Sequence, residues 1–241
     1  MIKSTFNLEK KLIESGYQII IGIDEAGRGP LAGPVVACAA ALKNHKSRIM
    51  NHAIKEFELI RDSKTLSEKQ REGLFDFIQE YFFVGIGICD HKTIDRMNIL
   101  KATFLAMKAA LASLNSKIKI QPACRRGRKS KLQFKNQNYL NKECIVLVDG
   151  NKVIPNLSVE QRAIVSGDKI VKSISAASVI AKVTRDRIMR KMHDKYPEYG
   201  FDKHKGYGTK FHINALKKNG HSKIHRKTFE PVKTLVKRGK R

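Results

Sequence analysis

IIIGIDEAGRGP, residues 19–30, is the stretch of sequence that decides the fold. Its first half, isoleucines interrupted by a single glycine, is typical of a short strand buried on both faces of a sheet. Asp24 and Glu25 end this strand, where carboxylates are unexpected unless a positive group meets them. In the turn that follows, Gly27 and Gly29 allow a ligand to approach the backbone, and Arg28 can hold an anion through paired hydrogen bonds. The alternative is an ordinary polar turn with Asp24 as a local cap.

The net charge of the chain points to its partners. The 241 residues include 48 Lys and Arg against 22 Asp and Glu, which leaves a formal charge of +26. This surplus predicts attraction to polyanions, nucleic acid first and an anionic membrane surface second. No apolar run approaches the roughly 20 residues that a membrane-spanning helix needs, and residues 1–16 lack the apolar core of a signal peptide. We therefore expect a cytoplasmic protein with no membrane partner.

The four cysteines are Cys38, Cys89, Cys124 and Cys144. None has CxxC spacing, and three lie in apolar, strand-like runs. They are interpreted as small buried hydrophobic residues in a reducing compartment, not as a disulfide framework or a zinc site.

Further apolar runs predict the rest of a sheet. Residues 34–42 form a second strand, whose simplest place is antiparallel to the first, and residues 82–89 form a third. Residues 143–151 (ECIVLVDGN) repeat the opening theme, with an apolar strand that ends in Asp149 and a glycine. If these two strands are neighbours, Asp24 and Asp149 lie together at the edge of an α/β sheet where ligands bind. A short strand is expected at residues 162–165.

Three helices are predicted around this sheet. Thr65 and Glu68 have the spacing of a capping box, so a helix is expected to begin there. An apolar stripe over residues 97–114 indicates a second helix that packs on the core. Residues 171–193 form the third, which carries Asp186 four residues after Lys182. An i,i+4 ion pair on an exposed helix face is therefore the simple alternative to a functional role for Asp186.

Three polar or basic segments remain. Lys64, in the Asp-Ser-Lys sequence before the first of these helices, lies either in a phosphate-facing corner or in a solvated loop. Residues 117–142 carry nine basic side chains and no acid, so they are predicted to be a mobile insertion that either solubilises the protein or binds phosphates. Residues 196–241 mix aromatic and basic side chains, which suits stacking on bases or sugars. Within them, His221 and His225 are expected on the surface, not as a metal pair.

Clustered acids in so basic a chain indicate a nuclease. Asp24, Glu25, Asp149 and Asp186 would repel one another at neutral pH unless divalent cations were present. Oxygen ligands favour Mg²⁺ or Mn²⁺ over zinc, and two such ions ~3.5–4 Å apart support phosphoryl displacement. Neighbouring residues on a strand face opposite ways, so Asp24 and Glu25 share one site only if the chain bends at Glu25.

Five segments of the chain carry distinctive motifs. They are GIDEAGRGPLAGPVV (22–36), DSKTLSEKQRE (62–72), VDGN (148–151), SISAASVIAKVTRDRIM (173–189) and YGFDKHKGYGTKFH (199–212). In sequence and in order, over nearly the whole chain, these segments resemble the ribonuclease HII family, the type 2 ribonucleases H.

The resemblance implies an α/β fold of the RNase H type, a mixed five-stranded sheet flanked by helices with a C-terminal helical appendage. We accordingly expect a catalytic domain over residues 1–195, which includes the basic insertion, and a substrate-binding segment with a basic tail over residues 196–241. The chain departs from the family pattern at that insertion, where a short link is usual, and at His221, where a proline is common.

The resemblance also implies the activity. The enzyme would hydrolyse RNA in RNA/DNA hybrids and nick 5′ of single ribonucleotides in duplex DNA, leaving a 3′-hydroxyl and a 5′-phosphate. By position, Asp24, Glu25, Asp149 and Asp186 would be the catalytic, metal-binding carboxylates, with Mg²⁺ or Mn²⁺ as cofactor.

The same resemblance assigns substrate contacts. The Gly27, Arg28 and Gly29 turn would read the 2′-hydroxyl and its phosphate, Tyr207 would pack on the ribose, and Lys64 would lie near the scissile bond. We expect a monomer. Two alternatives stay open: a type 3 ribonuclease H that acts on hybrids only, and a non-catalytic nucleic-acid-binding protein.

Overall fold

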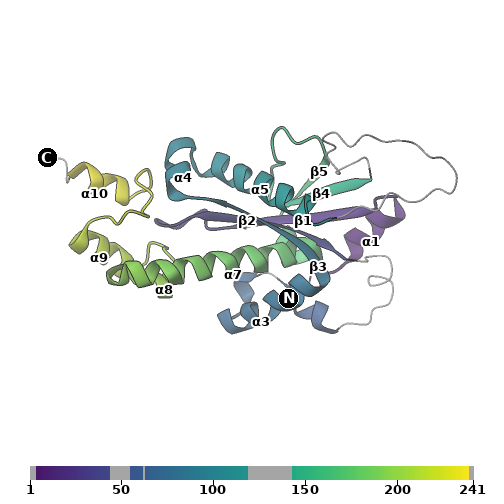
Figure 1. The fold of residues 1–241 in the computed structure, drawn as a ribbon, viewed down its shortest axis with the longest axis horizontal. Helices are drawn as coiled ribbons and strands as arrows, with labels where there is room; N and C mark the ends of the chain where they lie inside the picture. The colour runs from purple at the N-terminus through teal and green to yellow at the C-terminus, as the bar shows by residue number, and fades with distance from the viewer. Residues whose placement is uncertain (1–3, 44–54, 62, 119–142, 239–241) are drawn as a thin grey trace.

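A mixed sheet forms the centre of the computed structural model, which describes residues 4–43, 55–61, 63–118 and 143–238 (Figure 1). Its order is β3-β2-β1-β4-β5. The strands are β1 (Ile19–Ala26), β2 (Val35–Leu42), β3 (Phe82–Cys89), β4 (Cys144–Asp149) and β5 (Glu160–Ile164). The predicted strands and the five-stranded mixed sheet are thus confirmed.

The pairing of the strands follows from their connections. β1 and β2 are antiparallel, with Ile23 opposite Ala39, as the short turn between them predicts. β2 and β3 are also antiparallel, whereas β1 and β4 are parallel, with Ile23 beside Val148. β1, β2 and β4 are buried on both faces, which explains their continuous apolar sequences.

Helices cover both faces of the sheet. One face carries α5 with α4 beside it, and the opposite face carries α7 and α3 (Figure 1). The helices are α1 (Asn7–Glu14), α3 (Glu68–Tyr81), α4 (His91–Met97), α5 (Ile99–Asn115), α6 (Gly167–Ile170), α7 (Lys172–Lys195), α8 (Phe201–His204), α9 (Lys210–Asn219) and α10 (Val232–Arg238), with short 3-10 turns at Lys55–Leu59, Ser63–Thr65 and Pro197–Tyr199. The apolar stripe of α5 is buried as predicted, with Met107, Leu111 and Leu114 in the core.

The start of α3 differs from the prediction. The capping box is made by Ser67 and Gln70, two residues after the expected pair of Thr65 and Glu68. Ser67 Oγ accepts from the Gln70 N–H at 3.2 Å, and the Gln70 side chain accepts from the Ser67 N–H at 2.9 Å. Thr65 instead ends a 3-10 turn, so the turn that carries Lys64 stands apart from the helix.

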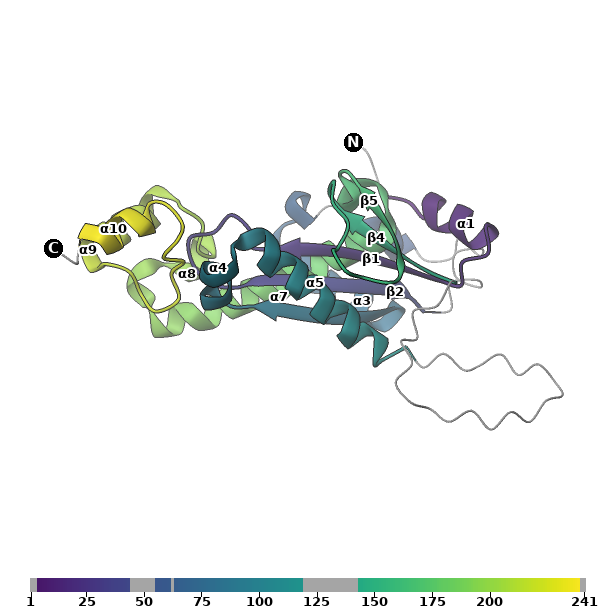
Figure 2. The same ribbon diagram turned by 90° about the horizontal axis from the view of Figure 1, so that it is seen from above.

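The C-terminal helices lie beyond one end of the sheet, where α7 extends to meet them (Figure 2). A separate apolar cluster joins them to the rest of the molecule, and it includes Leu31 and Ala32 after β1, Met189 on α7, and Phe201 and Leu216. This packing fixes the segment after residue 196 against the turn that follows β1. None of the helices that the structure describes is long and apolar enough to cross a bilayer.

Three of the cysteines, Cys38, Cys89 and Cys144, are free and buried, as expected for small apolar residues. Burial raises the pKa of the Cys144 thiol to about 12, which leaves it uncharged at neutral pH. Cys124 and nearly all of the basic insertion lie outside the described residues.

Candidate active site

Two of the predicted acids meet because β1 and β4 are parallel neighbours. Ile23 pairs with Val148, so Asp24 and Asp149, the next residues along, lie side by side at the same edge of the sheet. Gly22 allows α7 to approach β1 closely, since a Cβ there would lie 2.2 Å from the Ser173 carbonyl carbon. The prediction that these two strand ends come together is confirmed.

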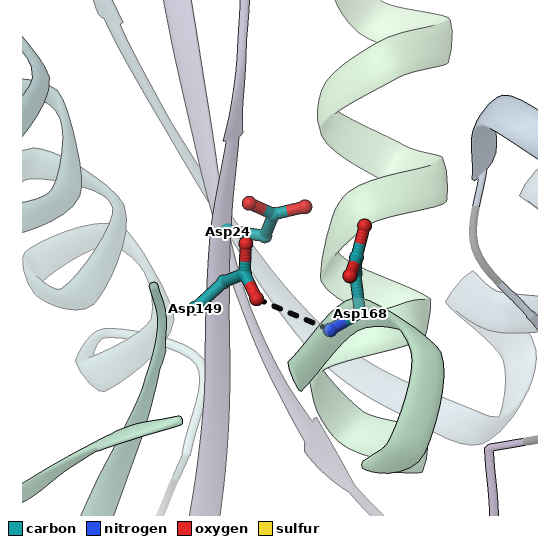
Figure 3. A group of neighbouring side chains, drawn as sticks. All are labelled: Asp24, Asp149 and Asp168. Carbon is teal, nitrogen blue, oxygen red and sulfur yellow. Dashed lines mark hydrogen bonds between the residues drawn. The ribbon is translucent and has the colours of Figure 1, made fainter. Parts of the chain in front are cut away.

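A third acid, Asp168, completes the group. Asp24, Asp149 and Asp168 each place one carboxylate oxygen within 4.8 Å of the others, and the three side chains gather between β1, β4 and α6 (Figure 3). Asp168 is on α6, and its main-chain N–H donates to the Asp149 carboxylate at 3.2 Å. Nothing in the sequence distinguishes Asp168, because an acid in a Gly-Asp-Lys sequence before a helix is typical of any solvated turn. Its burial, at 3% exposed, is what distinguishes it.

The acids repel one another inside the protein. Burial raises the pKa of Asp24 well above its ordinary value, and the neighbouring Glu25 and Asp149 add to this. Burial likewise raises the pKa of Asp149, and the like charge of Asp168 adds to this. A divalent cation would relieve this repulsion, and a set of oxygen ligands fits Mg²⁺ or Mn²⁺. The residues present therefore suit a metal ion.

Lys64 supplies one positive charge to this group. Its Nζ lies 3.2 Å from Asp168 Oδ2, and its side chain is 76% exposed while that of Asp168 is 4% exposed. The turn is also anchored to α7, because the Ser63 and Ser178 hydroxyls are 2.9 Å apart. Lys64 thus lies at the solvent side of the acids. It belongs to the turn for which the sequence allowed either a phosphate-facing corner or a solvated loop.

Glu25 flanks the three aspartates without joining them. β1 stays regular through Ala26, with Glu25 opposite Ala37, so the chain does not bend at Glu25 as a shared site would require. The Glu25 carboxylate pairs with Arg28 Nη1 at 3.1 Å and, together with Asp149, lines a shallow pocket beside α5. Burial raises the pKa of Glu25, whereas Arg28 lowers it.

The structure corrects the predicted place of Asp186 among the clustered acids. The structure does not bring it to the other acids: it is 2% exposed on α7 and lies 2.6 and 2.7 Å from Lys182 Nζ. Arg71 Nη2 lies 3.8 Å from the same carboxylate, and Arg71 Nη1 donates to the Ser63 carbonyl at 2.9 Å. Asp186 therefore contacts Arg71, which in turn binds the main chain of the turn that carries Lys64. The predicted i,i+4 pair with Lys182 is present, but it is mostly buried, because the Lys182 side chain is 22% exposed and that of Asp186 is 3% exposed.

The turn after β1 uses its two glycines differently. Gly27 has φ +99°, and a Cβ there would lie 2.1 Å from Arg185 Nε, so this glycine makes room for the protein interior and not for a ligand. Gly29 is exposed, and among the described residues a Cβ there would meet only Tyr207 Cε1, at 3.7 Å. The turn and Tyr207, which is 45% exposed, therefore share one surface.

A pair of buried histidines holds Tyr207 in place. The Ser222 N–H donates to His225 Nδ1 at 2.9 Å, so neutral His225 carries its proton on Nε2, which lies 2.9 Å from His212 Nε2. His212 Nδ1 then donates to the Tyr207 carbonyl at 2.9 Å. His225 is fully buried, which corrects the expectation of a surface residue, while His221 is exposed as expected. Burial lowers the pKa of His212 to about 4 and of His225 to about 3.

Known proteins resemble this chain over almost its full length. The family model for Ribonuclease HII matches residues 21–232. Ribonuclease HII of Fusobacterium nucleatum subsp. nucleatum is 47% identical over 219 residues, which cover 90% of this chain and 88% of that protein. Ribonuclease HII of Endomicrobium trichonymphae is 40% identical over 241 residues, covering 100% and 99% of the two chains.

Solved structures agree on the fold. The crystal structure of ribonuclease H2 from Pyrococcus horikoshii OT3 matches with a TM-score of 0.62 and 27% identity, over 93% of this chain and 100% of that one. That of Bst-RNase HIII in complex with Mn²⁺ matches with a TM-score of 0.65 over 95% of this chain and 72% of that one, but at 16% identity the likeness concerns the fold alone.

The fold, the acidic site and the sequence relatives agree. The sheet and its helices are of the RNase H type, and a metal-dependent nuclease needs a group of carboxylates such as Asp24, Asp149 and Asp168. The protein is an enzyme with ribonuclease H activity, and the chain belongs to the ribonuclease HII family.

Proposed function

We propose that this enzyme is an endoribonuclease that hydrolyses the RNA strand of RNA/DNA hybrids and nicks 5′ of single ribonucleotides in duplex DNA. The products are a 3′-hydroxyl and a 5′-phosphate. The observation that carries the proposal is the convergence of Asp24, Asp149 and Asp168 within 4.8 Å, next to the turn of Gly27–Gly29. The formal charge of +26 supports a nucleic-acid substrate.

Asp24, Asp149 and Asp168 are the proposed metal ligands, with Glu25 beside them, and Asp168 replaces Asp186 in this set. Two bound Mg²⁺ or Mn²⁺ ions would supply an activated water and stabilise the charge on the leaving oxygen. The protein's own part is to hold the three aspartates, with Glu25 beside them, in a fixed arrangement that cations make favourable. Lys64 stands on the exposed side of Asp168, where it can meet a phosphate of the substrate.

Recognition of the substrate is assigned to the surface that Gly29 and Tyr207 share. A single ribonucleotide in DNA differs from its neighbours by one 2′-hydroxyl, so a reader has to approach that sugar closely. Exposed main-chain groups at Arg28 and Gly29 permit that approach, and the ring of Tyr207 can pack on the sugar. We further propose that the enzyme acts as a monomer in the cytoplasm, and that residues 1–195 and 196–241 serve as catalytic and substrate-binding parts.

The test is a map of cleavage sites on two substrates, an RNA/DNA hybrid and a DNA duplex with one ribonucleotide, each with Mg²⁺, with Mn²⁺ and with chelator. We expect metal-dependent cleavage of both, with the nick 5′ of the single ribonucleotide. Cleavage of the hybrid alone would indicate type 3 specificity. Asp24→Asn and Asp149→Asn should each abolish cleavage while binding persists, and full activity in either variant would refute the proposed site.

A further inference from the structure

Two buried arginines lie behind the turn that follows β1. Arg226 is 0% exposed and Arg185 is 1% exposed, and both guanidinium groups donate to main-chain carbonyls. Arg226 Nη2 donates to Gly27 O at 2.6 Å, and Arg226 Nη1 donates to Arg28 O at 2.9 Å. Further bonds run from Arg226 to Gly33 O and Pro34 O, and from Arg185 to Ala32 O, Pro34 O and Lys205 O.

This arrangement is costly for the fold. Among the described residues, no carboxylate forms an ion pair with either arginine, so main-chain carbonyls accept the hydrogen bonds of both buried charges. Asp186 and Asp95 favour the two charges only from a greater distance. Burial accordingly lowers the pKa of Arg185 to about 10 and of Arg226 to about 9, and each charge lies near the other. A purely structural contact would be made at lower cost by an apolar side chain.

The bonds of Arg226 fix the direction of two peptide units. In a trans peptide, the C=O and the N–H of one plane point in opposite directions. The carbonyls of Gly27 and Arg28 point inward to Arg226, so the N–H groups of Arg28 and Gly29 point outward. Both residues are exposed, and neither N–H donates to an acceptor within the described part of the chain. A carbonyl bonded to a cation also polarises its own amide, which strengthens the N–H as a donor.

We propose that Arg226, backed by Arg185, is a positioning residue for substrate recognition: it turns the Arg28 and Gly29 N–H groups toward the phosphate and 2′-hydroxyl of a ribonucleotide. The inference rests on the proposed function, because it assigns the ribonucleotide to this turn. Arg185 adds a second link, since its guanidinium carbon lies 6.0 Å from the centre of the Tyr207 ring. One buried pair thereby connects both parts of the recognition surface.

The experiment compares the full-length wild type with Arg226→Lys, Arg226→Gln and Arg226→Ala. Each is titrated, with Ca²⁺ in place of Mg²⁺ to prevent cleavage, against a DNA duplex with one ribonucleotide and the same duplex in DNA alone. KM and kcat are then measured with Mg²⁺. Arg190→Gln is the matched control, because Arg190 is a partly exposed arginine of α7 that pairs with Glu68 and Glu72.

We expect the ratio of the affinity for the ribonucleotide duplex to the affinity for the DNA duplex to fall about ten- to hundredfold in the Arg226 variants. This is the effect of losing one or two hydrogen bonds. KM should rise more than kcat falls, and free guanidinium ion should restore part of the ratio in Arg226→Ala. The control should keep the ratio of the wild type. An unchanged ratio and KM in folded Arg226→Gln, or a fall in kcat alone, would overturn the positioning role.

A measurement on the wild type covers the case in which no variant folds. With ¹⁵N-glycine labelling, the Gly29 amide proton should move downfield when the ribonucleotide duplex binds, and much less with the DNA duplex. Equal or absent shifts would overturn the inference. A wild type that shows no preference for the ribonucleotide duplex would instead refute the proposed function, so the two failures are distinguishable.

Discussion

The main-chain N–H of Asp168 donates to the carboxylate of Asp149 across 3.2 Å (Figure 3). This bond joins the end of β4 to α6, two elements that no local sequence pattern connects. It places the Asp168 side chain beside Asp149 and opposite Asp24, so that three carboxylates surround one small space. The site is therefore assembled by a helix turn as well as by the two strand ends.

Asp168→Asn and Asp186→Asn should behave differently. Asp168 is a proposed metal ligand, so Asp168→Asn should lower kcat/KM by more than about a hundredfold, because even partners outside a ligand set are worth about 10–100-fold. Asp186→Asn removes the charge that balances Lys182, so its main effect should be a loss of about 1–3 kcal/mol in the free energy of unfolding. Steady-state kinetics and urea unfolding of both variants check this. Equal losses of activity would return Asp186 to the catalytic group.

Gly27→Ala and Gly29→Ala should differ in stability. A Cβ at Gly27 would meet Arg185 Nε at 2.1 Å and the Pro34 carbonyl oxygen at 2.7 Å, in a backbone with φ +99°. We expect a loss of about 2 kcal/mol or more. At Gly29, such a Cβ would have only Tyr207 within 4 Å in the described part of the chain. The free energy of unfolding of Gly29→Ala should therefore lie within about 0.5 kcal/mol of the wild-type value, and the variant should lose substrate affinity instead. Chemical denaturation and duplex binding of both variants check this. A large loss of stability in Gly29→Ala, with none in Gly27→Ala, would contradict the prediction.

The affinity for metal ions should change with pH over a higher pH range than for a site of ordinary aspartates. A metal ion needs the carboxylates deprotonated, and burial raises the pKa of Asp24, Glu25 and Asp149. Affinity for Mn²⁺ should therefore fall with decreasing pH while the pH is still above the ordinary aspartate pKa of about 3.9. Calorimetry in buffers of different ionisation enthalpy would detect the released protons. Binding that is independent of pH over this range would contradict the raised values.

Acid should destabilise the C-terminal region through His212 and His225. Their folded pKa values, about 4 and about 3, lie below the ordinary 6.5, so between these values the unfolded chain binds more protons. The free energy of unfolding should fall as the pH drops below about 6.5, by at most about 1.4 kcal/mol per pH unit for each histidine. Urea unfolding between pH 7 and 5 measures this slope. His212→Asn with His225→Asn should flatten it, whereas the exposed His221→Asn should leave it unchanged.

Much of the fold and part of the site follow from the sequence alone. Continuous apolar runs that end in Asp24 and Asp149 predict strands buried on both faces, because only a strand covered on both faces has no polar side. The sequence predicts a shared edge for the two acids only if these strands are neighbours, and the parallel pairing of β1 with β4 fulfils that condition. The stripe of α5 identifies a core helix by its period, and the resemblance over five segments correctly gives the ribonuclease HII family.

Only the tertiary structure decided which other residues complete the site. Asp168 and Asp186 are both acids near basic residues, and no spacing in the sequence distinguishes one from the other. Their roles differ because α6 contacts the end of β4, whereas Arg71 and Lys182 contact Asp186. Arg226, near the C-terminus, meets Gly27 through a contact across 199 positions. Local patterns record which face of an element is buried, whereas charges in contact over such separations are set by the packing of whole elements.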